Sequence, residues 1–105
     1  MKIAKKHELH LIEDTAQSLM SVYCDNEGLS GKAGTFWSCG TTSFFPSKNL
    51  GCFGDGGAII TRSVDFAGLL EEVTNHGSAF KYNHEIVGVN SRLDAVQAAI
   101  LRVKL

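Results

Sequence analysis

Apolar side chains recur at helical spacing between residues 63 and 77. The positions i, i+3, i+4 and i+7 are occupied by Phe66, Leu69, Leu70 and Val73. This spacing places all four side chains on one face of an α-helix. Ser63 is a suitable N-cap ahead of the repeat, and His76-Gly77 is a suitable C-terminal stop. The pattern predicts a helix between these two signals.

A second helical repeat occupies the last part of the chain. Its apolar face consists of Leu93, Val96, Ile100 and Val103. The preceding Ser91-Arg92-Leu93-Asp94 has the form of a capping box with aspartate in place of glutamate, so the helix is expected to begin there. No stop signal follows, because Leu105 lies inside the apolar repeat, and Met1 likewise opens within a helical segment. We therefore expect the chain to be a segment of a longer protein.

Short segments typical of β-strands precede these helices. Ile3 to His10 contains helix formers and runs into His10-Leu11-Ile12, which predicts a helix end followed by a short strand that stops at Glu13-Asp14. Further strand candidates are Thr35-Phe36-Trp37, Thr42 to Phe45 and Gly57 to Thr61. Tyr23 to Gly34 is predicted to be a loop or hairpin connection, and Pro46 to Gly56 a long loop. This order predicts an α/β fold with a small sheet.

Composition and charge exclude several classes of protein. The 105 residues suffice for one domain, and 10 Lys+Arg against 11 Asp+Glu leave a formal charge of −1, which indicates neither nucleic-acid binding nor attraction to a membrane surface. No segment approaches the ~18 apolar residues of a membrane span. Lys2, Lys5 and Lys6 leave no room for the apolar core of a signal peptide, so cytoplasm is the expected compartment.

The cysteines and histidines do not indicate a metal site. Cys24, Cys39 and Cys52 are an odd number at wide spacing, which predicts free, buried thiols. The histidines form no zinc-type cluster with them, so no metal ligand is assigned.

Lys48 is the strongest candidate for chemistry. It follows the uncharged run Ala33 to Ser47 and stands in aromatic and glycine-rich surroundings. An apolar environment lowers the pKa of an ammonium group, and the neutral amine then attacks carbonyls in Schiff-base chemistry. The alternative is an ordinary solvated lysine in a loop.

Asp14 and Gln17 are candidates of a second kind. Asp14 ends a predicted strand, and ligands of open α/β sheets bind beyond the carboxyl ends of strands. Gln17 lies on the same side if the chain turns helical after Asp14. The alternatives are a turn or N-cap aspartate and a solvated glutamine.

Together, separated motifs in the chain resemble one family. The motifs are Ile12 to Ser18, Thr42 to Gly51, Gly54 to Ala58, Asn75-His76-Gly77, Lys81-Tyr82, Gly88 to Asp94 and Gln97-Ala98-Ala99. Their content and order closely resemble the DegT/DnrJ/EryC1/StrS aminotransferases, which use pyridoxal phosphate to aminate nucleotide-linked keto-sugars. The resemblance implies a partial three-layer αβα large domain of an aspartate-aminotransferase-like, fold-type I enzyme. Residues 1–105 are then the central segment of that cofactor-binding domain, without its N-terminal part and the C-terminal small domain.

The resemblance also implies a role for each matching residue. Lys48 corresponds to the lysine that bonds to the cofactor aldehyde and moves a proton during the reaction. Asp14 corresponds to the carboxylate that keeps the pyridine nitrogen protonated, and Gln17 to a side chain near the ring oxygen. Ser43 matches a hydroxyl that binds the cofactor phosphate. Asn90 matches an amide that reaches this phosphate from the partner subunit, which implies a homodimer. The alternative for Asn90 is a helix N-cap beside Ser91, and the two roles are compatible because helix N-termini favour phosphate.

By the same resemblance, the amino group comes from a donor such as glutamate and the product serves surface polysaccharide or related sugar synthesis. Tyr23 to Thr41 resembles the branch that acts on UDP-linked acetamido sugars. Relatives with dehydratase activity carry histidine at the position of Lys48, so the lysine favours amino transfer. A dehydratase relative and a non-catalytic scaffold or binding module stay open as alternatives, and the 105-residue segment alone is expected to be inactive.

Overall fold

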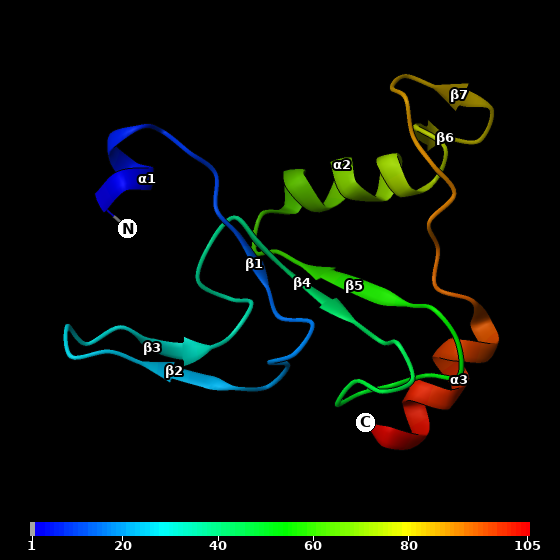
Figure 1. The fold of residues 1–105 in the computed structure, drawn as a ribbon. Coiled ribbons are helices and arrows are strands. Elements are labelled where there is room, and N and C mark those ends of the chain that lie inside the picture. The colour runs from blue at the N-terminus through cyan, green and yellow to red at the C-terminus, as the bar shows by residue number, and fades with distance from the viewer. Residues whose placement is uncertain (1) are drawn as a thin grey trace.

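A three-stranded sheet lies at the centre of the computed structural model, which describes residues 2–105 (Figure 1). The expected helical position of Met1 therefore lies outside the described residues. Strand β1 (Ile12–Asp14) pairs in parallel with β4 (Cys39–Ser43), which pairs antiparallel with β5 (Gly57–Ile60). The α/β fold with a small sheet is confirmed.

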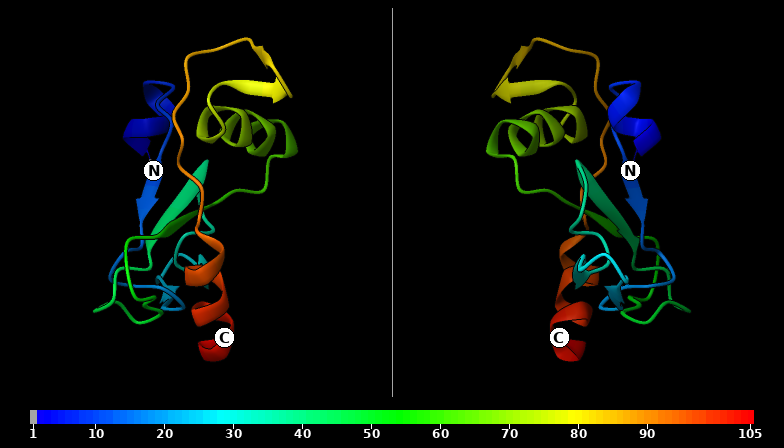
Figure 2. Two further views of the ribbon diagram at one scale, coloured as in Figure 1. Left: turned by 90° about the vertical axis from the view of Figure 1, so that its right-hand side faces the viewer. Right: turned by 90° about the vertical axis from the view of Figure 1, so that its left-hand side faces the viewer.

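Helix α2 (Val64–Thr74) forms where the apolar repeat predicted it and lies on one side of the sheet (Figure 2). The backbone N–H of Phe66 donates to Oγ of Ser63 over 3.2 Å, which confirms the N-cap. At the other end, the Gly77 N–H donates to the Glu72 carbonyl over 2.8 Å while His76 and Gly77 have φ of 63° and 72°. This is the left-handed geometry of a helix stop. The chain then forms the small hairpin of β6 (Ser78–Phe80) and β7 (Asn83–His84).

Helix α3 (Ala95–Lys104) begins three residues later than predicted. Asp94 is the N-cap, because its side chain accepts from the Val96 N–H over 2.7 Å. The expected start at Ser91 is wrong, since the Ser91 N–H donates to the Thr74 carbonyl over 2.9 Å and Asn90 forms a backbone bridge with Asn75. The interpretation of Asn90 as a helix N-cap is wrong for the same reason.

The predicted strand Thr35-Phe36-Trp37 is wrong. This segment bends, and its Phe36 and Trp37 N–H groups donate to the Glu13 carboxylate rather than to a neighbouring strand. The strand predicted from Thr42 to Phe45 begins earlier, at Cys39, and ends at Ser43, whose Oγ accepts from the Phe45 N–H. The hairpin expected between Tyr23 and Gly34 is confirmed as β2 (Val22–Cys24) and β3 (Ser30–Lys32).

The first helix is shorter than predicted, and the first strand lies later. Helix α1 spans Lys2–Lys6 and gives way to a turn in which Glu8 has a φ of 53°. The strand then begins at Ile12, so His10 and Leu11 belong to the connection.

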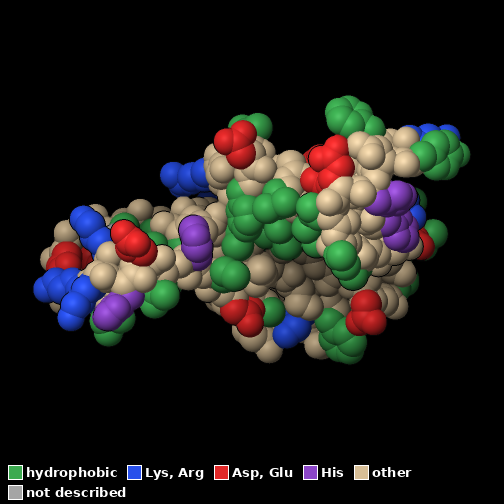
Figure 3. All heavy atoms as spheres, turned by 90° about the horizontal axis from the view of Figure 1, so that it is seen from above, with side chains coloured by type: hydrophobic (Ala, Val, Ile, Leu, Met, Phe, Trp, Pro, Cys, Tyr) green, Lys and Arg blue, Asp and Glu red, His purple; other side chains and the backbone are tan. Residues whose placement is uncertain are grey.

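The described residues form an open, thin structure. Its extents are 48 × 35 × 18 Å and its radius of gyration is 15.9 Å, against about 13 Å for a compact domain of this size. Among residues 2–105, the buried apolar side chains are those of Cys39, Cys52 and Leu101. The burial expected of the cysteines is thus confirmed for two, whereas Cys24 is exposed. Apolar side chains lie uncovered over much of the surface (Figure 3).

Candidate active site at the ends of two parallel strands

Three of the candidate residues lie at, or shortly after, the carboxyl ends of two neighbouring parallel strands. Asp14 is the last residue of β1, and Ser43 is the last residue of β4. Lys48 lies in the loop that leaves β4 and returns to β5. Because β1 and β4 run in the same direction, both strands end at the same edge of the sheet (Figure 1). Asp14 and Ser43 therefore lie at the same edge, and the loop that carries Lys48 leaves the sheet from the end of β4.

The register of the sheet determines which face these residues share. Asp14 is opposite Thr41 in the parallel ladder, and side chains alternate between faces along each strand. Ser43, two residues beyond Thr41, is therefore on the same face as Asp14. Thr15, which follows Asp14, is 2% exposed. Its N–H and Oγ1 both donate to the Thr41 carbonyl, over 2.7 and 2.8 Å. These bonds attach the end of β1 firmly to β4.

Lys48 stands on a closed loop. Its N–H donates to the Phe45 carbonyl over 2.9 Å, and a Cβ placed on Gly51 would lie only 2.5 Å from the Pro46 carbonyl oxygen. Glycine at position 51 thus permits the two sides of the loop to approach closely. The Lys48 side chain is half-buried, which differs from the fully solvated lysine of the alternative interpretation.

Asp14 and Ser43 each use one side-chain atom for a local turn. Oδ1 of Asp14 accepts from the Ala16 N–H over 3.0 Å, which is the turn geometry of the alternative interpretation. Oγ of Ser43 accepts from the Phe45 N–H over 3.2 Å. These bonds orient both side chains and leave the second carboxylate oxygen of Asp14 and the hydroxyl hydrogen of Ser43 available to a ligand.

The other two candidate residues, Gln17 and Asn90, do not lie at the ends of β1 and β4. Gln17 is exposed, and its segment forms successive turns, with Ser18 donating to Thr15 and Ser21 to Ser18, so the helical condition for Gln17 is not met. Asn90 lies beside the C-terminal end of α2, paired with Asn75. Its Oδ1 accepts from Nε of Arg92 over 3.0 Å.

Glu13 organises the surroundings of Asp14, a role that the sequence did not indicate. Its carboxylate accepts three backbone N–H groups, from Gly34 over 2.6 Å, Phe36 over 2.7 Å and Trp37 over 3.1 Å. Nothing in the sequence distinguishes Glu13 from any other glutamate beside an aspartate. Only the fold shows that the Glu13 and Asp14 carboxylates bind different partners.

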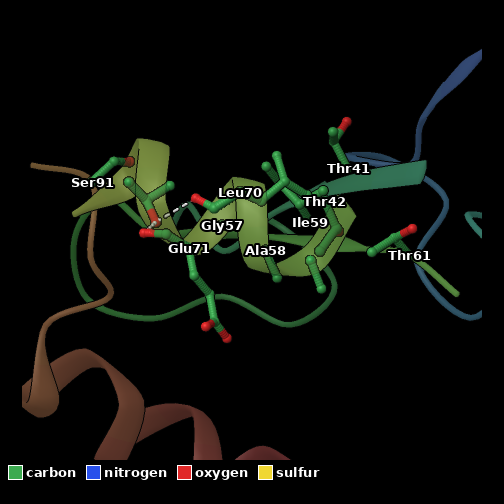
Figure 4. A pocket seen from close by; sticks show the side chains of 11 residues that line it. Thr41, Thr42, Gly57, Ala58, Ile59, Thr61, Leu70, Glu71 and Ser91 are labelled. Carbon is green, nitrogen blue, oxygen red and sulfur yellow. Dashed lines mark hydrogen bonds between the residues drawn. The ribbon is translucent and has the colours of Figure 1, made fainter. Parts of the chain in front are cut away.

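A cavity of about 440 Å³ lies between the sheet and α2 (Figure 4). Its lining includes Thr41, Thr42, Ala58, Ile59, Leu70 and Ser91. None of the five candidate residues lines it. It is a gap in the packing of helix on sheet rather than a continuation of the strand-end cluster.

Residues 2–105 hold no group of three or more His, Cys, Asp or Glu side chains that could bind a metal ion. None of their helices is long and apolar enough to cross a membrane.

Comparison with known proteins decides the family. The sequence profile of the DegT/DnrJ/EryC1/StrS aminotransferase family matches residues 1–105. The chain belongs to this family. The resemblance inferred from the motifs is therefore confirmed over the whole chain.

Individual members of the family agree with this placement. The chain is 47% identical over 104 residues to dTDP-3-amino-3,4,6-trideoxy-alpha-D-glucose transaminase of Streptomyces venezuelae, with 99% of the chain and 26% of that protein covered. It is 50% identical over 102 residues to a pleiotropic regulatory protein of Geobacillus stearothermophilus, with 97% and 26% covered. The chain thus spans about a quarter of the length of these relatives.

A solved structure confirms the fold. The crystal structure of a DegT DnrJ EryC1 StrS aminotransferase from Brucella abortus matches 98% of the chain and 26% of that protein, with a TM-score of 0.86 and 42% identity. The expected α/β fold of a fold-type I enzyme is confirmed.

Proposed function

We propose that the chain is the central segment of the large domain of a pyridoxal-phosphate-dependent aminotransferase that transfers an amino group to a nucleotide-linked keto-sugar. The observation that carries the proposal is that Asp14 and Ser43 end two neighbouring parallel strands, with Lys48 in the loop that leaves the second of them. Family membership and the dTDP-sugar transaminase relative support the reaction class.

The residues at this edge fit the chemical groups of pyridoxal phosphate. The cofactor has an aldehyde, a basic ring nitrogen and a phosphate, and these call for an amine, a carboxylate and a hydrogen-bond donor. Lys48, Asp14 and Ser43 supply these groups in turn, and Asp14 keeps an oxygen beyond its turn bond. When bound, the cofactor supplies an electron sink for the carbon that gains or loses the amino group.

Each residue has a distinct task in this proposal. Lys48 holds the cofactor through its amine and, once released, carries the proton to and from the reacting carbon. The Asp14 carboxylate holds a proton on the ring nitrogen. The Ser43 hydroxyl binds the phosphate, while Gln17 approaches the ring oxygen from the exposed turn after β1.

Asn90 reaches the phosphate of the neighbouring subunit in a homodimer. This proposal is supported by the exposure of Asn90, which pairs with Asn75 at the C-terminal end of α2. Because Oδ1 of Asn90 accepts from Arg92, its amide N–H groups remain as donors for a phosphate. The proposal also includes glutamate as the amino donor, a product sugar that serves surface polysaccharides, and a cytoplasmic location.

A non-catalytic role is the second candidate. It is favoured by the relative from Geobacillus stearothermophilus, whose name describes a regulatory protein. A test of Lys48 distinguishes the catalytic function from the non-catalytic one, because a scaffold does not require an amine at this position.

The decisive experiment uses the longer parent protein, obtained with the residues that flank Met1 and Leu105. We expect pyridoxal phosphate to give a visible absorbance band, and borohydride treatment to fix the cofactor's mass on the peptide that contains Lys48. Lys48→Ala removes both signals, whereas Lys32→Ala, an exposed lysine of β3, keeps them. A Lys48→Ala protein that retains the band contradicts the assignment, and a deoxygenated rather than aminated sugar product indicates the dehydratase class.

A further inference from the structure

We propose that Gln97 of α3 is a positioning residue for the loop that carries Lys48. The inference rests on the proposed function, because it concerns how the Lys48 amine is held in place. Its basis is a set of contacts between α3 and the loop from Phe44 to Gly56, which lie more than forty residues apart in sequence.

The base of the loop is closed by backbone and thiol contacts. The Cys52 N–H donates to the Phe44 carbonyl over 2.8 Å, and the Phe44 N–H donates to the Gly56 carbonyl over 2.8 Å. The Cys52 side chain, 1% exposed, has its Sγ 2.9 Å from the Phe44 oxygen and 3.0 Å from the Gly54 oxygen. These bonds close the segment from residue 45 to residue 51, which carries Lys48.

Helix α3 contacts this loop at two points. Oε1 of Gln97 accepts from the Phe53 N–H over 2.8 Å, and the Gln97 amide packs on Gly54, where an added Cβ would lie 3.3 Å from Nε2. About two turns further along α3, Nζ of Lys104 donates to the Gly51 carbonyl. The side chain of Leu101, 4% exposed, anchors the helix between these two contacts.

The two contacts flank the buried Cys52 and lie within five residues of Lys48. A lysine side chain is long and flexible, so the accuracy with which its amine meets a ligand depends on its backbone. A displacement of about 1 Å at a reacting group reduces rates by roughly a hundredfold. We infer that Gln97 reduces this displacement without touching the cofactor or the substrate.

The test compares two substitutions at position 97 in the parent enzyme. Gln97→Met keeps the length of the side chain but removes the acceptor, whereas Gln97→Glu keeps an oxygen for the Phe53 N–H. In the cofactor-free enzyme, we expect Phe53 amide exchange to become roughly tenfold faster in Gln97→Met and to return towards the wild-type rate in Gln97→Glu. Arg102→Met, an exposed residue of the same helix, leaves the exchange unchanged.

The second readout concerns Lys48 itself. Gln97→Met slows formation of the Lys48-dependent visible band by about tenfold or more and shifts the pH midpoint of that band, and Gln97→Glu restores both. Because Gln97 is half-buried, Lys104→Met at the exposed end of α3 serves as the second variant and acts through Gly51.

The outcomes distinguish the two proposals. A wild-type enzyme without a Lys48-dependent band overturns the proposed function together with this inference. A normal wild-type band that neither Gln97→Met nor Lys104→Met alters overturns the inference alone. The inference is also overturned if Phe53 exchange accelerates while the rate and pH midpoint of the band stay at wild-type values, because Gln97 is then a purely structural residue.

Discussion

At Asp14, a local turn and the proposed chemistry use different oxygens of one carboxylate. Oδ1 accepts from the Ala16 N–H, and this bond fixes the side chain at the end of β1. Among residues 2–105, no hydrogen bond engages Oδ2. The turn interpretation and the catalytic interpretation of Asp14 are therefore compatible, since the turn orients the oxygen that remains for the ring nitrogen.

Asp14→Asn tests this division of labour in the parent enzyme. The amide oxygen of asparagine can still accept from the Ala16 N–H, so the turn and the Lys48-dependent visible band are expected to persist. The neutral side chain no longer stabilises a protonated ring nitrogen, and kcat falls by several powers of ten. The measurement is kcat for amino transfer beside the absorbance of the bound cofactor.

Glu27→Gln is the matched control for Asp14→Asn, because it removes one carboxylate charge from an exposed position of the β2–β3 hairpin. Its kcat is expected to equal that of the wild type. An Asp14→Asn enzyme that turns over at the wild-type rate excludes Asp14 as the partner of the ring nitrogen.

Lys48 and Asp14 can be proposed from local sequence features, whereas Ser43 is proposed from the family resemblance alone. Lys48 interrupts a long uncharged run, and Asp14 ends a short strand. The sequence assigns no role to Glu13 or Gln97, although both lie in motifs of the family, because their partners are twenty-one or more residues away. Only the topology that places β1 beside residues 34–37, and α3 beside the loop of Lys48, reveals their contacts.

Among the elements, helix α2 and the segment from Thr35 to Trp37 show where propensity succeeds and fails. Helix α2 has its cap, apolar repeat and stop within fifteen residues, so local signals suffice to predict it. The segment at Thr35 contains aromatic and β-branched residues typical of strands, yet Gly34 has a φ of 87° and the N–H groups of Phe36 and Trp37 donate to Glu13. A carboxylate from β1 replaces the strand neighbour that β-propensity assumes.

Glu13→Gln tests whether this carboxylate maintains the bend. The amide oxygen of glutamine can replace Oε1, which serves Phe36 and Trp37, but its NH₂ group then faces the Gly34 N–H, donor against donor. The loss of a charge-assisted bond and the remaining donor conflict cost about 1.5–3 kcal/mol. In the parent enzyme, we expect Gly34 amide exchange to accelerate more than tenfold and that of Phe36 to change less.

Glu8→Gln, an exposed glutamate before β1, serves as the control for this exchange experiment. Equal protection of Gly34 in the wild type and in Glu13→Gln shows that the bend is held by other contacts. The proposed organising role of Glu13 is then wrong.

At the scale of the whole molecule, the chain exposes apolar side chains and an open strand edge that a complete domain would cover. The sheet has three strands, and β1 stands at its edge with Ile12 67% exposed. Other large apolar side chains are even more exposed, such as Val87 at 99% and Phe53 at 77%. Exposed apolar surface favours association, and an uncovered strand edge pairs readily with another chain.

We therefore expect the isolated 105-residue chain to associate and to lack the Lys48-dependent band. Its few buried apolar side chains give too little hydrophobic stabilisation to offset the conformational entropy lost on folding. Sedimentation over a range of concentrations should show self-association, and heating should show no cooperative unfolding by circular dichroism. The parent enzyme, with the apolar surface covered, should unfold cooperatively. A monodisperse monomer of the isolated chain with a sharp thermal transition refutes this view and shows that the 105-residue chain can fold alone.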